Sequence, residues 1–160
     1  MTYSVSVAIR NSILYTCHMH DPLRALPGYL LRRAASSLTA ELSRKLAALD
    51  LRIADMSMLL LIEANPGITQ SELGRMLDIQ RANMTPMAAK LGERGLVARE
   101  AVNGRSQGLA LTKAGKALAK QAYNIASNFE AELLDRLPPA LRPCAVPLLT
   151  ALWLNDQCYM

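Results

Sequence analysis

The first strong helical pattern lies between residues 29 and 50. Apolar side chains recur there at steps of three and four residues, which is the spacing of one face of a helix. Residues 54–64 are apolar on nearly every side, so they are predicted to form a helix that packs between other elements. Asn65-Pro66-Gly67 ends that helix, because proline cannot continue its hydrogen bonds and glycine accepts left-handed geometry. Residues 1 to about 25 show no sustained period and are predicted to form an irregular arm.

Two short helices are predicted next. Thr69, followed three residues later by Glu72, forms a capping box that opens a helix with Leu73, Met76 and Leu77 facing inward. A second helix begins near Gln80 and ends at Gly95. Pro86 leaves two interpretations of it open: the helix effectively begins later, or the proline kinks it. The predicted inward face is Met84, Met87, Ala88 and Leu91, and the outward face is Arg81, Ala82, Thr85, Pro86 and Ala89.

A β-hairpin and two further helices follow. Residues 96–101 and 109–111 are predicted to be strands joined by a turn over residues 102–108, because the Asn103-Gly104 pair is a strong hairpin signal. Thr112 is predicted to cap a long helix that Pro138-Pro139 ends. A last helix starts near residue 140, with a kink at residue 147. The apolar faces of these two helices are Leu118, Ala122, Ile125, Phe129 and Leu133, and then Leu141, Ala145, Leu148 and Leu152.

The composition fits one folded domain, or one domain with an oligomerisation element. The 160 residues are 51% hydrophobic and 19% charged, with a net charge of +5, which is compatible with a polyanionic partner. The longest apolar run, residues 58–62, is far shorter than the roughly 20 residues that span a bilayer, so no membrane partner is expected. The three cysteines include no CxxC pair, which favours a reducing cytoplasm. Secretion is the disfavoured alternative, because Arg10-Asn11-Ser12 interrupts the apolar stretch before Cys17.

The predicted order of helix, short turn, helix and polar-tipped hairpin is that of a winged helix-turn-helix. The fold is therefore expected to be mainly α, with a small two- or three-stranded β-wing. The second helix of such a unit enters the major groove of double-stranded DNA, so its outward side chains are small or polar. Arg105, at the hairpin tip, is expected in a minor groove or on its phosphates. The candidate DNA-binding residues are Thr69, Gln70, Ser71, Gln80, Arg81, Ala82, Asn83, Thr85, Pro86, Lys90, Arg105 and Ser106.

Three segments in this order resemble the MarR family of bacterial transcriptional regulators, and the likeness extends over roughly residues 28–155. The resemblance implies a homodimer, usually a repressor, whose first and last helices interleave and whose winged domains bind a pseudo-palindromic operator. The segments are Asn65-Pro66-Gly67-Ile68-Thr69-Gln70-Ser71-Glu72-Leu73, Leu91-Gly92-Glu93-Arg94-Gly95-Leu96-Val97-Ala98-Arg99 and Leu111-Thr112-Lys113-Ala114-Gly115.

The organisation expected from this resemblance has three parts: an N-terminal arm (1–27), dimerisation helices (28–50 and 113–160) and a winged helix-turn-helix domain (51–112). The resemblance also implies that a small, aromatic-type effector releases the DNA from a site between the winged domain and the dimer helices. The candidate effector-binding residues are Tyr29, Arg33, Met56 and Met58.

Two positions depart from the family pattern. Asn103 stands two residues before Arg105, where the family often has an acidic residue that braces the wing. Arg52 stands where a threonine commonly caps the second helix, which leaves Asp50 or Asp55 to help. Neither departure changes the expected fold.

Several alternatives stay open from the sequence. Between Thr69 and Gln107 six basic and four acidic residues give only +2, so a winged-helix module that binds protein is a rival, as is a DNA binder without an effector. Metal binding or redox sensing by Cys17, His18 and His20 is disfavoured, and no metal or cofactor is predicted. No HExxH motif or glycine-rich phosphate loop is present, so an enzyme is not expected. Two roles stay open for four further basic residues, which either bind phosphate or pair with Glu72, Glu93 or Glu100. These residues are Arg75, Lys90, Arg94 and Arg99.

Overall fold

A computed structural model describes the backbone of residues 21–103 and 106–157, and the side chains of residues 21–101 and 107–154. The chain divides into two compact units after Ala35. The first unit holds a 3-10 helix, η1 (Pro22–Ala25), and the first turns of α1 (Pro27–Leu46). The expected irregular arm is wrong for residues 22–25, because Asp21 caps η1 by accepting the Leu23 N–H at 3.1 Å.

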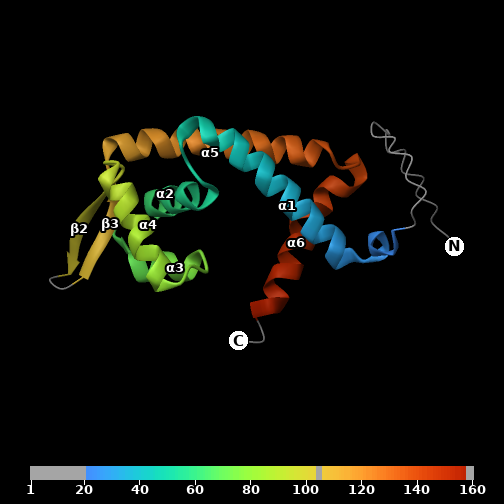
Figure 1. Cartoon of the computed structure of the whole chain (residues 1–160), viewed down its shortest axis with the longest axis horizontal. Helices are drawn as coiled ribbons and strands as arrows, with labels where there is room; N and C mark the ends of the chain where they lie inside the picture. Colours follow the sequence, from blue (N-terminus) through green and yellow to red (C-terminus); the bar gives the residue numbers. More distant parts are fainter. Residues whose placement is uncertain (1–20, 104–105, 158–160) are drawn as a thin grey trace. The chain divides into compact units, whose positions relative to one another are not determined.

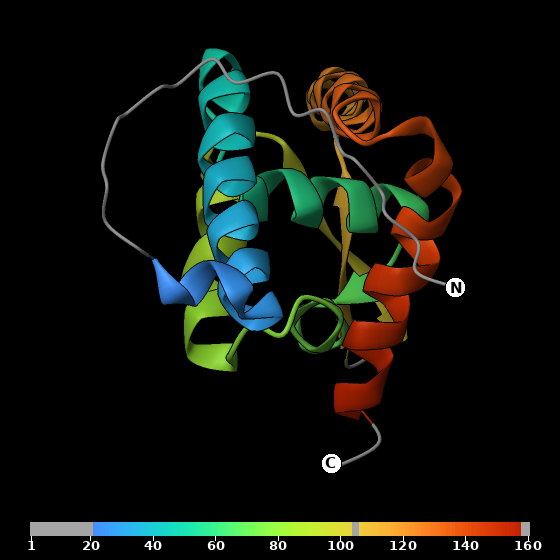
Figure 2. The same cartoon turned by 90° about the vertical axis from the view of Figure 1, so that its right-hand side faces the viewer.

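The second unit holds the rest of α1 and all later elements (Figure 1). Its sheet is antiparallel, with the strand order β1-β3-β2. Viewed along α5, helix α2 crosses beneath it (Figure 2), and the two helices pack against each other. The elements are η2 (Ala47–Leu49), α2 (Ile53–Ala64), β1 (Ile68–Thr69), α3 (Gln70–Met76), α4 (Arg81–Glu93), β2 (Val97–Asn103), β3 (Ser106–Leu111), α5 (Lys113–Asp135), η3 (Pro139–Leu141) and α6 (Arg142–Gln157).

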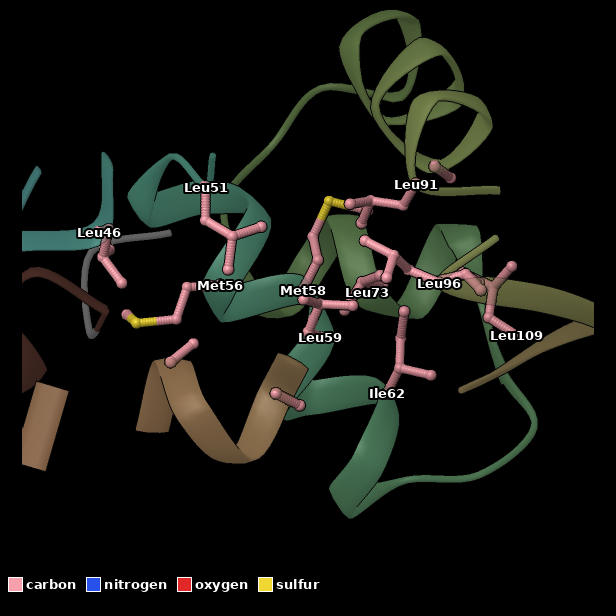
Figure 3. Packing of buried hydrophobic residues seen from close by; sticks show 14 of the residues in the cluster. Leu46, Leu51, Met56, Met58, Leu59, Ile62, Leu73, Leu91, Leu96 and Leu109 are labelled. Atoms are coloured by element: carbon pink, nitrogen blue, oxygen red, sulfur yellow. The ribbon is translucent and has the colours of Figure 1, made fainter. Parts of the chain in front are cut away.

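The core of this unit is built around α2, as the apolar pattern predicts. Met58, Leu59 and Ile62 of α2 are almost completely buried, together with Leu73 of α3 and Leu91 of α4 (Figure 3). Burial of each such side chain contributes roughly 1.5–3 kcal/mol to folding. The core therefore holds α2, α3 and α4 together by apolar packing.

The inward face of α3 differs from the expectation at one position. Leu73 is buried and Leu77 is half-buried, but Met76 is 55% exposed. Gly74 is buried instead, because a Cβ there would lie only 3.0 Å from the carbonyl oxygen of Ile79. The close approach of the following turn to Gly74 thus determines which face of this short helix is covered.

The hairpin is longer than the sequence predicts. Glu100 pairs with Gly108, Ala101 with Gln107 and Asn103 with Ser106, with a bulge between residues 101 and 103. The expected turn over residues 102–108 is therefore wrong at residues 102–103 and 106–108, which are strand. Strand pairing uses backbone groups, so it continues through polar residues that carry no apolar signal.

Ion pairs connect the C-terminal half of α1 with α5. The ammonium of Lys45 lies 2.8 Å from Oε2 of Glu132, and both guanidinium Nη atoms of Arg136 donate to the carboxylate of Glu41. The hydrogen bond from Arg136 lowers the pKa of Glu41 below its ordinary value despite some desolvation, which raises it. These pairs, together with buried Leu42 and Leu46, hold this part of α1 in the second unit.

Helix α6 exposes many of its apolar side chains. Pro143 lies in its first turn and Pro147 inside it, and the helix continues past both. Among the described residues no single helix has the length and apolar content to cross a membrane, although the bent pair of α5 and residues 139–154 passes by length and composition. The exposed apolar residues from residue 141 onward are Leu141, Val146, Leu148, Leu149, Leu152, Trp153 and Leu154.

The junction between β3 and α5 requires glycine at position 115. Thr112 caps α5 by accepting the Gly115 N–H at 3.0 Å, and its own hydroxyl donates to the carbonyl oxygen of Gly95 at 2.7 Å. A Cβ at position 115 would lie 2.0 Å from the backbone oxygen of Leu96. The start of α5 is therefore packed directly against the start of β2.

We predict that Gly115→Ala lowers the free energy of unfolding by about 3 kcal/mol or more, because backbone atoms must move to admit the methyl group. Gly92→Ala is the matched control. Its Cβ would meet only the Val97 oxygen at an ordinary 3.7 Å, so a neutral change or a gain of up to about 1 kcal/mol is expected. Urea unfolding measures both, and equal stabilities of the two variants would contradict this packing.

Candidate nucleic-acid interface

A capping box holds the start of α3. The Thr69 N–H donates to Oε2 of Glu72 at 2.9 Å, its hydroxyl donates to the same oxygen at 2.7 Å, and the Glu72 N–H donates back to Oγ1 of Thr69 at 3.3 Å. The hydrogen bonds from the Thr69 N–H and hydroxyl lower the pKa of Glu72. Thr69 and Gln70 are half-buried and Ser71 is exposed. The capping box thus defines the orientation of the first turn of α3.

A tight turn links α3 to α4. Asp78 has a left-handed backbone, with φ of 51°, and the Ile79 N–H donates to the carbonyl oxygen of Gly74 at 2.8 Å. Gln80 then provides the extended N-cap of α4. The two helices therefore form a compact helix-turn-helix.

Helix α4 buries one face and exposes the other, as the sequence predicts. Met84, Ala88 and Leu91 are buried and Met87 is half-buried. The buried side chains join the core cluster around α2, so they determine which face of the helix remains outside. The exposed residues of the N-cap and helix include Gln80, Arg81, Ala82, Asn83, Thr85, Pro86, Ala89 and Lys90.

Pro86 lies inside α4, so the interpretation that this helix begins after the proline is wrong. Proline has no N–H, and the carbonyl oxygen of Ala82 consequently lacks its usual helical donor. The hydroxyl of Thr85 donates to the carbonyl oxygen of Arg81 at a long 3.4 Å. The proline therefore frees a backbone acceptor on the exposed side of α4.

A polar groove of about 420 Å³ runs between the start of α3, α4 and the hairpin. The guanidinium of Arg99 on β2 lies there, 3.4 Å from Oε1 of Gln107 on β3. Sequence reasoning left Arg99 undecided and missed Gln107. The pairing register of β2 and β3 could have indicated that both residues lie on the hairpin beside this groove, but the sequence pattern placed Gln107 in a turn. The lining residues are Thr69, Gln70, Ser71, Thr85, Arg99, Gln107 and Leu109.

A second groove of about 550 Å³ lies beside α4, where the start of α2 contributes Arg52. Asp55 provides the helix cap that Arg52 itself cannot. The carboxylate of Asp55 accepts the Arg52 N–H at 3.1 Å and two guanidinium N–H groups at 2.9 Å. Burial raises the pKa of Asp55, but the hydrogen bonds and charge of Arg52, with a contribution from Lys90, outweigh it and lower the pKa. Lys90 also lines this groove.

The candidate effector residues fall in both units. In the first unit Tyr29 is half-buried and Arg33 is exposed. The Cζ atom of Arg32 lies over the ring of Tyr29, 5.6 Å from the ring centroid. Met56 and Met58 are buried in the second unit. A further groove of about 640 Å³ between α2 and α5, lined mostly by apolar side chains with Lys116, Lys120 and Glu63, contains none of the four.

Some predicted residues lie outside the described part of the chain. Arg105 is among them, as are Cys17, His18 and His20. Ser106 begins β3, and its side chain is not described. Within residues 21–103 and 106–157, no three His, Cys, Asp or Glu side chains come together as metal ligands would.

A helix-turn-helix is followed here by an antiparallel hairpin, and a third strand, β1, which precedes α3, completes the sheet. This arrangement defines a winged helix-turn-helix protein. The MarR family model matches residues 51–104. Over 112 residues the chain is 36% identical to the HTH-type transcriptional repressor Rv2887 of Mycobacterium tuberculosis, covering 69% of this chain and 81% of that protein. The chain belongs to the MarR family, a family of transcriptional regulators.

Solved structures agree with this assignment. The transcriptional repressor CouR bound to a 23-mer DNA duplex superimposes with a TM-score of 0.75 at 33% identity, covering 81% of this chain and 94% of CouR. CouR bound to p-coumaroyl-CoA gives 0.73 at 31% identity, covering 85% and 97%. Rv2887 in complex with salicylic acid gives 0.65 at 33% identity, covering 79% and 95%.

We predict that Asp55→Asn lowers the free energy of unfolding at pH 7 by about 1–3 kcal/mol, since a buried charge-assisted cap is weakened. Because the pKa of Asp55 is lowered on folding, its stabilisation is complete above the unfolded value of about 3.9 and is lost as the pH falls through the folded value. The variant should therefore lose less stability than the parent between pH 5 and 3. Glu63→Gln, at an exposed carboxylate, is the control, and parallel pH profiles for parent and D55N would refute the assignment.

Proposed function

We propose that this protein binds double-stranded DNA as a homodimer and represses transcription, with α4 as the helix that enters the major groove. The observation that carries the proposal is the exposed face of α4, where small side chains such as Ala82 and Ala89 leave room for close approach and polar ones remain free to read bases. The capped start of α3 next to it suits a phosphate contact.

Each candidate residue has a proposed role. Gln80, Asn83 and Thr85 read base edges, while Arg81 and Lys90 bind phosphates. Thr69, Gln70 and Ser71 contact the DNA backbone and position it. Ala82 and Pro86 are small enough to let α4 approach the DNA closely. Arg105 and Ser106 are assigned to the minor groove or its phosphates from their place in the sequence alone.

The apolar surface of α6 supports the homodimer. An exposed set of large side chains that includes Leu148, Leu152 and Trp153 is typical of a surface that another chain covers. We propose that residues 28–50 and 113–160 form the dimer scaffold, that residues 51–112 bind DNA, and that residues 1–27 are an arm. Two winged domains would then contact half-sites about one helical turn apart.

We further propose that the protein acts in the cytoplasm, without enzymatic activity, and that an aromatic-type effector releases its DNA. The relatives support the last point, since Rv2887 binds salicylic acid and p-aminosalicylic acid and CouR binds p-coumaroyl-CoA. Tyr29, Arg33, Met56 and Met58 stay our candidates for the effector site.

DNA binding is tested with duplexes that the parent protein selects from a random pool. Lys90→Ala should weaken binding to all selected sequences and reduce the slope of log affinity against log salt by about 1, because one phosphate contact is lost. Asn83→Ala should instead change base preference at particular positions by about 1–3 kcal/mol. Fluorescence anisotropy measures both effects, with Lys120→Ala on α5 as a charge control.

Parental binding from both variants would contradict the assigned surface. Failure of the parent to select any duplex would contradict DNA binding itself and favour the rival winged-helix module that binds protein, which the charge of only +2 between Thr69 and Gln107 supports.

The effector proposal is tested by thermal unfolding with salicylate and p-coumarate, with cyclohexanecarboxylate as the non-aromatic control. An aromatic ligand specific to the folded state should stabilise it by about 2.7 kcal/mol at 100 times its Kd. It should also weaken operator binding in the same anisotropy measurement. If neither acid shifts the transition or the DNA affinity, the protein is insensitive to these effectors, as the ligand-free rival predicts.

A further inference from the structure

The C-terminal end of α4 is a rigid helix cap. Gly95, with φ of 68°, donates its N–H to the carbonyl oxygen of Gly92 at 2.8 Å, and the Leu96 N–H donates to that of Leu91 at 3.0 Å. These two bonds form a Schellman motif, which fixes the backbone of the preceding residue, Arg94. The side chain of Arg94 therefore leaves α4 from a defined position.

The segment that follows α1 ends in the same way. Asp50 has a φ of 50°, its N–H donates to Ala47 at 3.0 Å, and the Leu51 N–H donates to Leu46 at 3.4 Å. Such an ending leaves the last carbonyl oxygens without helical donors. Leu51 is buried in the core, so this ending is also held in place.

The guanidinium of Arg94 joins the two endings. Its Nη1 donates to the carbonyl oxygen of Asp50 at 2.8 Å, and its Nη2 approaches the carbonyl oxygen of Leu49 at 3.5 Å. The same Nη2 lies 3.5 Å from Oδ2 of Asp50, whose side chain is 90% exposed, whereas that of Arg94 is 24% exposed. A cation at the end of a helical segment is also favoured by the partial negative charge of its free carbonyls.

Of the two interpretations the sequence leaves for Arg94, the geometry supports neither in its simple form. The residue pairs with Asp50 rather than with Glu93, and its donors point to backbone oxygens of the α1–α2 connection. Because the guanidinium of Arg94 already donates to these backbone oxygens, it is not available to bind a phosphate.

We propose that Arg94 is a positioning residue that sets the angle at which α4 is presented to DNA. It ties the end of α4 to the junction between α1, part of the proposed dimer scaffold, and α2. This inference rests on the proposed function, because a fixed spacing between two recognition helices matters only when both contact one duplex. Movement at the junction passes to α4 through this guanidinium.

The test measures binding of the parent's selected duplex by Arg94→Ala and Arg94→Lys across a range of salt concentrations. Arg94→Ala should bind about 3- to 30-fold more weakly, the range expected for a residue that couples two elements. The slope against log salt should stay at the parental value, because no phosphate contact is lost. Arg94→Lys keeps the charge but cannot form the fork, so it should restore the affinity only in part.

Stoichiometric titration of each variant gives the fraction competent to bind, which separates positioning from misfolding. If Arg94→Ala lowers only the fraction of protein that can bind, and the competent molecules bind DNA with parental affinity, the role of Arg94 is structural only and the proposal is overturned. A fall in slope of about 0.9 would also overturn it by identifying a phosphate contact, as would full rescue by lysine.

Asp50→Asn is the matched control. The substitution removes the side-chain carboxylate but keeps the backbone carbonyl that accepts from Arg94, and asparagine tolerates the left-handed backbone. It should bind like the parent, and a loss equal to that of Arg94→Ala would assign the effect to the exposed carboxylate instead. If the parent selects no duplex at all, the proposed function fails and this inference fails with it. If the parent binds and Arg94→Ala binds equally well, only this inference fails.

Discussion

The burial of one face of α4 is the constraint on which the rest of the molecule depends. Met84, Ala88 and Leu91 enter the core that Met58 and its neighbours on α2 provide. A helix can bury only one side against a core of this size, so the opposite side must face outward whatever its chemistry. The exposed, small and polar face of α4 is thus a consequence of apolar packing on its other side.

Helix ends give this arrangement its precision. Backbone groups at a helix terminus need partners outside the helix, and the side chains that supply them also connect neighbouring elements. Thr112 caps α5 and bonds to Gly95 behind α4, while Arg94 bonds to the carbonyls after α1. The same polar groups that end the helices therefore determine how α4 lies relative to the elements around it.

Membership in the MarR family does not require every position to follow the family pattern. Where a threonine commonly caps the second helix, Arg52 stands in this chain, and the buried carboxylate of Asp55 takes over the role of the cap. The substitution also adds an arginine to the groove next to α4, which Lys90 lines as well. A change at a cap thus alters the charge of a surface without altering the fold.

Periodicity and capping signals were enough to locate the helices, the inward face of α4 and the capping box of Thr69, because these depend on residues close in the chain. They could not find the exposure of Met76, the length of the hairpin, or the partners of Arg94. Gly74 rather than Met76 is buried where Ile79 approaches α3, and the hairpin extends through backbone pairing that leaves no apolar pattern. Arg94 meets Leu49 and Asp50 only after the core has brought distant segments together, and this long-range geometry is what the tertiary structure alone decides.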